Sequence, residues 1–148
     1  MFLIRCRPLL PAVLFLSLLS CTRLAAADCG ETVASEDLIH RRFVLSSLDG
    51  EPIRTATGPL TVEFLENFMV SGQACNAFRG QGELRNGILT VSNMIMTRRF
   101  CLDETLNRLD AIIGQLFAGG AEIDLEGNRL VLSGDGHRLE YYGDDWKR

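Results

Sequence analysis

The chain has 148 residues, which is room for one domain and a short extension, because a domain typically occupies about 100–200 residues. It carries 15 basic and 19 acidic residues, a formal net charge of −4. An acidic surface is unsuited to nucleic acid, whose phosphates require a basic face, so we expect no nucleic-acid partner.

Residues 1–20 have the features of an export signal peptide. Arg5 and Arg7 give a positively charged start, and Leu9 to Leu19 form an apolar run. That run is too short for a transmembrane helix, which needs about 20 residues. Removal of the signal leaves 13 basic and 19 acidic residues, a net charge of −6. Membrane association would then depend on an acyl chain rather than on attraction to anionic lipid.

The residues after the apolar run indicate a lipid anchor. Leu18-Leu19-Ser20-Cys21 resembles a bacterial lipobox, in which the cysteine is lipidated on its sulfur and becomes the new N-terminus. Because Thr22 rather than an aspartate follows Cys21, we expect anchoring in the outer membrane with the body in the periplasm. Cleavage after Ala27, which would leave a soluble periplasmic protein, is the alternative.

The anchor is followed by a segment that predicts a flexible tether. Residues 21–39 are small, polar and acidic, without apolar periodicity, as is typical of linkers. We expect one folded domain over residues 40–142 and a polar tail over residues 143–148.

The first half of the domain predicts short strands joined by turns. Strands are expected over residues 42–48, 60–64 and 68–72, because apolar and polar residues alternate there and turn residues separate them. A strand over 78–84 contains Gly80 and Gly82, which permit sharp bending. Asn86-Gly87 then predicts a hairpin. Residues 92–101 show no clear pattern and are not assigned to an element.

The second half predicts one helix and three strands. Apolar residues recur at spacings of three and four after Asp103: Leu106, Leu109, Ile112, Ile113, Leu116 and Phe117. Such a face packs on a sheet far more often than it binds a partner. Strands over 121–126, 129–133 and 137–142 then predict a meander. The fold class is mainly β (α+β): a curled antiparallel sheet or barrel of about eight strands, closed to hide its edges, with one packed helix.

Three cysteines remain once Cys6 leaves with the signal and Cys21 is lipidated. In an oxidising compartment we expect a disulfide between Cys75 and Cys101, closing a loop of about 25 residues and worth about 3.5 kcal/mol. Cys29 would then be a free thiol in the tether, with an intermolecular bridge as the alternative.

The same residues argue against a metal site and a catalytic thiol. The chain has no Cys-x-x-Cys pair and only two histidines, His40 and His137, far apart in sequence. A metal site needs about four convergent ligands, and an oxidising compartment disfavours a reduced nucleophilic cysteine. We therefore expect no metal, no cofactor and no catalytic residue.

Several short motifs occur in a characteristic order: Arg42-Phe43-Val44-Leu45, Ser71-Gly72, Cys75-Asn76, Phe78-Arg79-Gly80, Met96-Thr97-Arg98 and Cys101. This order resembles the META domain family of HslJ-type heat-shock lipoproteins, over residues 40–142. The family motif corresponds here to Gly72, Asn76, Phe78, Gly80, Thr97 and Arg98. The resemblance implies a β-barrel-like fold and a heat-inducible outer-membrane lipoprotein. It also implies a link to novobiocin tolerance, with no established enzymatic activity.

Individual motif residues carry different expectations. We expect Asn76 to hold a loop by hydrogen bonds to nearby backbone rather than to contact a ligand. Arg98 either clamps an anionic group or pairs with an acid. Arg99 and Phe100 depart from the family pattern, in which methionine or a small residue is more usual, and Arg99 must reach solvent or a partner.

The sequence therefore predicts a non-catalytic, monomeric lipoprotein of the heat-shock and envelope-stress type, bound to the membrane through its N-terminal lipid. The alternative is a binding module with an envelope protein as partner: a pilot or chaperone for an outer-membrane protein, a lipid carrier or a lysozyme inhibitor.

Overall fold

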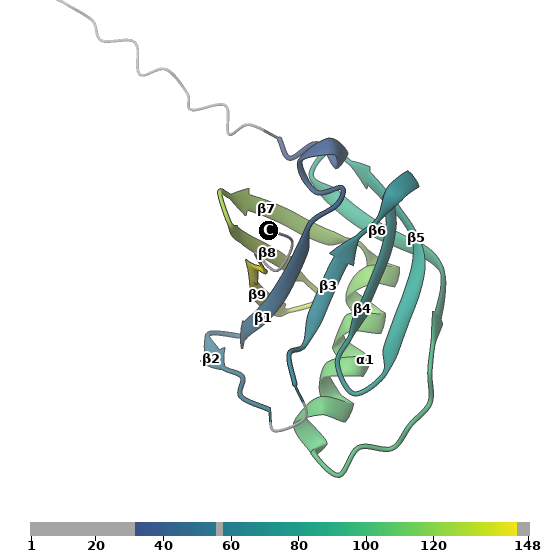
Figure 1. Ribbon diagram of the computed structural model, residues 1–148, viewed down its shortest axis with the longest axis vertical. Helices are drawn as coiled ribbons and strands as arrows, with labels where there is room; N and C mark the ends of the chain where they lie inside the picture. The colour runs from purple at the N-terminus through teal and green to yellow at the C-terminus, as the bar shows by residue number, and fades with distance from the viewer. Residues whose placement is uncertain (1–31, 56–57, 145–148) are drawn as a thin grey trace, which may run out of the picture. The chain divides into compact units, whose positions relative to one another are not determined.

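The computed structural model describes residues 32–55 and 58–144. Within them, eight antiparallel strands close into a barrel, a short ninth strand extends its edge, and one α-helix packs against it (Figure 1). The predicted mainly β fold with one packed helix is therefore confirmed. The signal peptide, Cys21 and Cys29 lie outside the described residues, so the structure does not bear on their predicted roles.

Most elements lie where the pattern of apolar residues predicts them. In chain order they are the 3-10 helix η1 (Ser35–Asp37), β1 (Arg42–Leu48), β2 (Glu51–Pro52), β3 (Thr61–Phe64), the 3-10 helix η2 (Glu66–Phe68), β4 (Met69–Gln73), β5 (Ala77–Arg85), β6 (Ile88–Met96), α1 (Glu104–Gly119), β7 (Ala121–Glu126), β8 (Arg129–Gly134) and β9 (His137–Gly143). The unassigned segment after residue 92 continues β6 as far as Met96. Asn93 has a positive φ of 50° there, and the register with β5 shifts near it, which interrupts the alternation.

The barrel closes by pairing its first and last long strands. The strand order is β1-β3-β4-β5-β6-β7-β8-β9, and β9 pairs with β1 from Phe43↔Gly143 to Leu48↔Leu139. The β6–β7 pairing is much shorter and consists of Ile88↔Glu122 and Leu89↔Ala121. The helix contacts β6 and β8 on either side of this seam, so it fills the space that the short pairing leaves.

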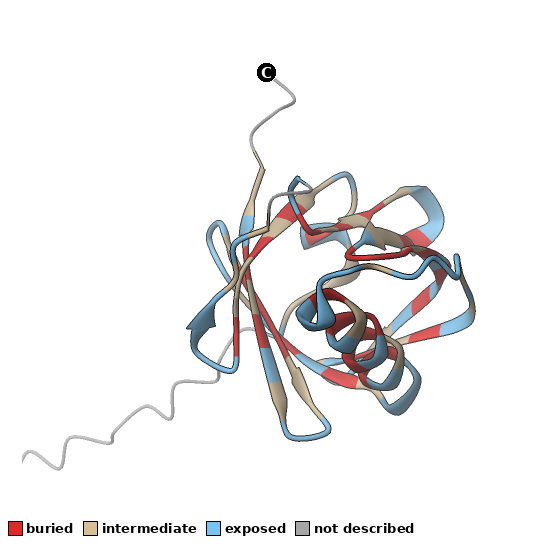
Figure 2. Ribbon diagram, turned by 90° about the horizontal axis from the view of Figure 1, so that it is seen from below, coloured by how far each residue is buried: buried red, intermediate tan, exposed pale blue. Residues whose placement is uncertain are grey.

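The core lies between the inner faces of the strands and the apolar face of α1. Figure 2 shows buried residues on the inward side of the barrel and along the side of the helix that faces it. Alternation along β1 and β3 buries Phe43 and Phe64, whose rings meet edge to face at 6.1 Å. The ring centroids of Phe78 in β5 and Phe117 in α1 are 5.8 Å apart. This contact fixes the helix to the wall that carries the family motif.

The predicted tether is wrong over its last residues. Leu38 is completely buried, Val33 and Ile39 pack against the same core, and Ser35–Asp37 forms η1. A single buried leucine in a polar segment produces no periodicity, so apolar spacing does not reveal it. The domain therefore begins before residue 40.

The predicted polar tail also begins too early. Gly143 is the last residue of β9, and the Asp144 backbone nitrogen donates to the Arg42 carbonyl at 2.8 Å. The two tyrosines that precede it divide as their alternation requires, with Tyr141 buried and Tyr142 half-exposed. Among the described residues, no helix combines the length and apolar character needed to cross a membrane.

Candidate functional site

Two residues of the family motif, Asn76 and Thr97, lie at the end of the barrel where the β4–β5 turn, the β6–α1 loop and the first half of α1 meet. The side chains that interact there belong to Cys75, Asn76, Thr97, Cys101, Asn107 and Asp110. We call these six residues the motif junction. Asn76 and Asp110, which contact each other there, are 34 positions apart in sequence, so the junction exists only in the folded domain.

A disulfide joins Cys75 in the β4–β5 turn to Cys101 in the β6–α1 loop. The two Cα atoms are 6.1 Å apart and the cysteines are 26 positions apart in sequence, a separation that unstrained disulfides commonly span. Both cysteines pack against the core, and Cys75 is 5% exposed. The bond therefore ties the loop that precedes α1 to the wall of the barrel.

Asn76 makes the largest number of contacts in the motif junction. Its side-chain nitrogen donates to the Arg99 carbonyl at 3.1 Å and to Asp110 Oδ2 at 2.7 Å. Its side-chain oxygen accepts from Thr97 Oγ1 at 2.8 Å and from the Arg99 backbone nitrogen at 2.7 Å. Since these bonds use both donors and both lone pairs of the amide, Asn76 has no capacity left for a ligand.

Asp110 is the partner that the sequence analysis missed. Its carboxylate is 8% exposed and accepts from both the backbone and the side-chain nitrogen of Asn76. These N–H groups offset the cost of burying the carboxylate. The available signal was its helical position, because Asp110 lies four residues after Leu106 and three before Ile113, within the apolar face. A polar residue in that face needs a buried partner.

Asn107 secures the other side of the same loop. Its side-chain nitrogen donates to the Cys101 carbonyl at 2.6 Å, and its oxygen accepts from the Cys101 backbone nitrogen at 3.3 Å. It too was not anticipated from the sequence, because a polar residue in the first turns of a helix is common. The backbone on both sides of Phe100 is thus held by side chains from two other elements.

The remaining motif residues serve packing. A Cβ at Gly72 would overlap the Thr61 carbonyl and the Phe78 ring, and one at Gly80 would lie 2.9 Å from the Ser92 carbonyl. Arg98 differs from them: its side chain is exposed, and it pairs with no acid in the described part of the chain. Of the two roles considered for Arg98, ion pairing with a described acid is therefore not observed.

The motif junction offers no group for chemistry other than the disulfide. Its hydroxyl, amides and carboxylate are hydrogen-bonded to one another or to nearby backbone, and both cysteines are oxidised. The histidines lie elsewhere, and His137 contacts Asp49 through Nδ1 at 2.9 Å. No group of three metal-binding side chains occurs among residues 32–55 and 58–144. The junction acts as a mechanical link between the barrel, the loop and the helix.

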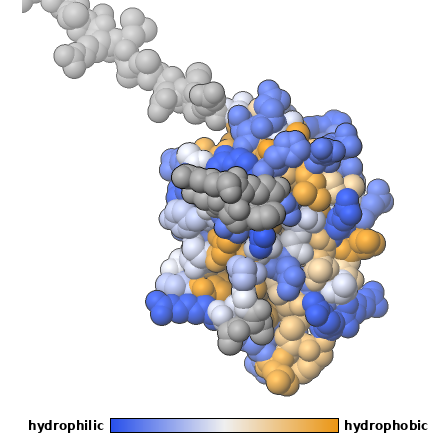
Figure 3. Space-filling model, viewed as in Figure 1, coloured by the Kyte–Doolittle hydropathy of each residue, from blue (hydrophilic) through white to orange (hydrophobic). Residues whose placement is uncertain are grey.

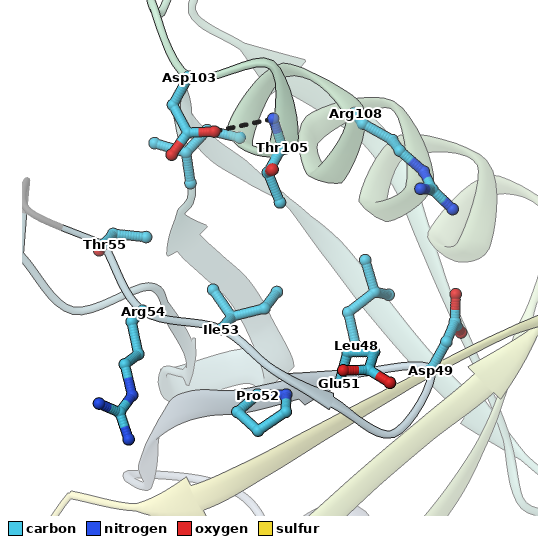
Figure 4. A pocket seen from close by; sticks show the side chains of 11 residues that line it. Leu48, Asp49, Glu51, Pro52, Ile53, Arg54, Thr55, Asp103, Thr105 and Arg108 are labelled. Carbon is cyan, nitrogen blue, oxygen red and sulfur yellow. Dashed lines mark hydrogen bonds between the residues drawn. The ribbon is translucent and has the colours of Figure 1, made fainter.

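A separate hollow of about 380 Å³ lies between the β1–β2 turn, the chain that follows β2, and α1 (Figure 4). Arg54 points away from the helix there, whereas Arg108 lies on the helix and extends toward the Asp49 side. Two of the three acids that line it are engaged: Asp103 accepts from the Thr105 nitrogen at 2.9 Å, and Asp49 accepts from the Arg138 nitrogen at 2.8 Å. The third, Glu51, is exposed. These charged groups do not converge on one point, so the hollow contains no binding constellation.

The sequence pattern of the META domain matches residues 36–146. The chain belongs to the META domain family. This META protein is 41% identical over 109 residues to "Heat shock protein HslJ" of Escherichia coli K12, a match that covers 74% of this chain and 78% of that protein. The predicted family is thereby confirmed.

Two solved structures resemble this META protein. One, determined by NMR, is 41% identical, covers 74% of this chain and 94% of its own, and superposes with a TM-score of 0.70. Another, from Burkholderia xenovorans, is 20% identical and has a TM-score of 0.64, covering 96% of this chain and 99% of its own. At that identity the second match supports the fold alone. The META family is not known for enzymatic activity.

Proposed function

We propose that this protein is a non-catalytic lipoprotein of the outer membrane, anchored through Cys21 and facing the periplasm, that contributes to the envelope-stress response and to novobiocin tolerance. The observation that carries the non-catalytic part is the motif junction. In an active site some polar groups remain available for substrate, whereas here both donors and both acceptors of Asn76 are bound within the protein.

Two further observations support the proposal. The similar E. coli protein is named as a heat shock protein, and the lipobox-like Ser20-Cys21 directly follows an apolar signal. Novobiocin must cross the outer membrane to act in the cytoplasm, so a change in the barrier is sufficient to alter tolerance. Binding of the drug by this protein is not needed.

A deletion strain tests the proposal. We expect lower novobiocin tolerance, lower survival at high temperature and greater outer-membrane permeability, all restored by the wild-type gene on a plasmid. If the deletion strain matches the wild type in all three measurements, the proposed role is wrong.

The Cys21→Ser variant tests whether the contribution to novobiocin tolerance requires the lipid anchor. Export should persist in this variant while the acyl chains are lost, so we expect it to restore tolerance poorly. Full restoration would favour the soluble periplasmic form that results from cleavage after Ala27. The intact mass of the mature wild-type protein reports lipidation, cleavage site and disulfide state together.

The second candidate is a binding module for an envelope protein. One specific observation favours it: Ile95, Phe100 and Leu102 are 73%, 84% and 95% exposed near the motif junction. Single exposed apolar residues are ordinary, but three at one end of a small domain indicate an interaction surface.

A further inference from the structure

One surface of the domain combines exposed apolar and basic side chains. It is formed by the end of β6, the β6–α1 loop and the neighbouring part of β5, and its residues are Arg79, Ile95, Arg98, Arg99, Phe100 and Leu102. We call it the loop surface. Figure 3 shows apolar side chains gathered at the lower end of the molecule, where Figure 1 places the β6–α1 loop.

The loop surface is held rigidly although its side chains point outward. Phe100 lies between Arg99, whose backbone is bound by Asn76 on both its nitrogen and its oxygen, and Cys101, which is bound by Asn107 and the disulfide. Phe100 and Leu102 are therefore displayed by a fixed backbone. A rigid display lowers the ordering cost of binding, which is the usual advantage of a preorganised interface.

Charge restricts what the loop surface binds. The side chains of Arg79, Arg98 and Arg99 have no hydrogen-bond or ion-pair partner in the described part of the chain. Several arginines elsewhere are engaged, as Arg129 is with Glu126 and Glu140. On a protein of net charge −4, three unengaged arginines in one place favour an acidic partner. The exposed acids nearby are Asp103, which caps α1, and Glu104.

The shape of the loop surface favours a partner whose side chains insert into it. Two hollows adjoin the exposed residues, one of about 300 Å³ lined by Phe78, Ile95 and Met96 among others, and one of about 280 Å³ lined by Phe100, Cys101 and Leu106 among others. Each is large enough for an aliphatic or aromatic side chain. The combination of arginines and apolar hollows matches a peptide segment that carries acids and apolar side chains in turn.

We propose that the loop surface binds an acidic segment of another envelope protein, through apolar side chains inserted beside Ile95 and Phe100 and acids paired with Arg98 and Arg99. The inference rests on the proposed function, since it takes the protein to face the periplasm. A second copy of this chain is a poor occupant, because a two-fold contact through the same surface would place arginines against arginines.

The anchoring membrane is also a poor occupant. The described chain begins at Thr32, at the end of the barrel opposite the β6–α1 loop (Figure 1). Ten residues lie between Cys21 and Thr32, and the eleven steps from one Cα atom to the next span at most about 36–40 Å when fully extended. A domain of this size is about 34 Å across. The tether would therefore have to be almost fully stretched to bring the loop surface onto that membrane.

Selection from a random peptide library displayed on phage tests the proposal. The bait is the unlipidated chain over residues 22–148, which retains the whole core formed by residues 33–141. We expect enriched peptides that combine Asp or Glu with aliphatic or aromatic residues. We also expect Phe100→Ser/Leu102→Ser and Arg98→Glu/Arg99→Glu to weaken their binding at least about tenfold.

Three controls make the result decisive. Tyr142→Ser changes an exposed aromatic on another strand and should leave peptide binding unchanged, while circular dichroism should show each variant folded. Vesicles of phosphatidylglycerol and phosphatidylethanolamine should not bind the chain.

Several outcomes would overturn the proposal. These are no enrichment, enrichment of basic peptides, peptide binding that the loop variants leave intact, or vesicle binding that the loop variants abolish. None of these results depends on lipidation or on drug tolerance. If the selection fails and the deletion strain is drug-sensitive, only the proposal for the loop surface is wrong. If the selection succeeds and the deletion strain matches the wild type, only the proposed stress role is wrong.

Discussion

Asn76 and Asp110 are joined twice, through the Asn76 backbone nitrogen at 3.1 Å and through its side-chain nitrogen, which lies 2.7 Å from Asp110 Oδ2. The two residues are 34 positions apart, and their bonds connect the β4–β5 turn to α1. Because the same amide also binds the β6–α1 loop, loss of the carboxylate should affect three elements at once.

We predict that Asp110→Ala lowers the free energy of unfolding by about 2–4 kcal/mol, because it leaves two buried N–H groups of Asn76 without an acceptor. Asp110→Asn, which keeps one acceptor oxygen, should cost less. Urea denaturation followed by circular dichroism measures both. The exposed Asp124→Ala should change stability by less than about 0.5 kcal/mol, and an equal effect at the two positions would contradict the buried link.

Reduction of the Cys75–Cys101 disulfide should lower the free energy of unfolding by about 3.5 kcal/mol, since the closed loop spans 26 positions and its closure restricts the unfolded chain. The measurement compares urea unfolding of the wild type with and without reductant. In the Cys75→Ala/Cys101→Ala variant, added reductant should have no further effect. A wild type equally stable in both conditions would mean that the bond does not stabilise the domain.

Two glycine substitutions should act in opposite directions. Gly72→Ala should prevent folding or cost more than about 3 kcal/mol, because the new methyl group would overlap the Thr61 carbonyl and the Phe78 ring. Gly114→Ala, inside α1, should stabilise the protein by about 0.5–1 kcal/mol, because its Cβ would lie 3.9 Å from Met94, an ordinary contact. Thermal unfolding of the two variants beside the wild type shows whether the signs differ as expected.

The domain should lose stability in acid through two carboxylates, those of Asp49 directly after β1 and of Glu140 in the middle of β9. The Arg138 backbone N–H, with His137, holds the pKa of Asp49 below its usual value of 3.8, and the Arg129 guanidinium holds the pKa of Glu140 below 4.5. A carboxyl whose pKa is lower in the folded state stabilises the protein fully above its unfolded pKa. This contribution is lost as the pH falls through the lower folded value.

Stability should therefore be nearly constant from pH 7 to about pH 5 and fall below about pH 4.5. Urea unfolding across this range measures the change. Glu140→Gln should flatten the acid limb, whereas Glu122→Gln, at an exposed position on β7, should not. An acid limb that is unchanged by Glu140→Gln would show that the Arg129 pair does not carry the dependence.

Local patterns were sufficient for most of the elements. The apolar spacing from Leu106 to Phe117 predicted α1, and Asn86-Gly87 predicted the β5–β6 turn, because each signal lies within one element and depends on its own geometry. The identity of the family followed from short motifs in order. The fold class then followed from the number of strands and the need to hide their edges.

No local sequence pattern predicted the contacts between residues that are distant in the chain. Packing of the whole chain determines the contact of β1 with β9, the short β6–β7 pairing and the position of Leu38 in the core. A single buried residue such as Leu38 produces no periodicity in the sequence. The partners of Asn76 were hidden for the same reason, since Asp110 lies 34 positions away on a helix whose other inward residues are apolar.

The loop surface illustrates the same division. Arginine and phenylalanine at positions 99 and 100 were visible as departures from the family pattern, but exposure is a property of packing. Phe100 and Leu102 remain outside because Cys101 between them is bonded to Cys75 through its sulfur and to Asn107 through its backbone, which holds Cys101 against the core. The sequence by itself identified Arg99 and Phe100 as unusual. Only the packing of the β4–β5 turn, the β6–α1 loop and α1 against one another determined which side chains of the loop face solvent.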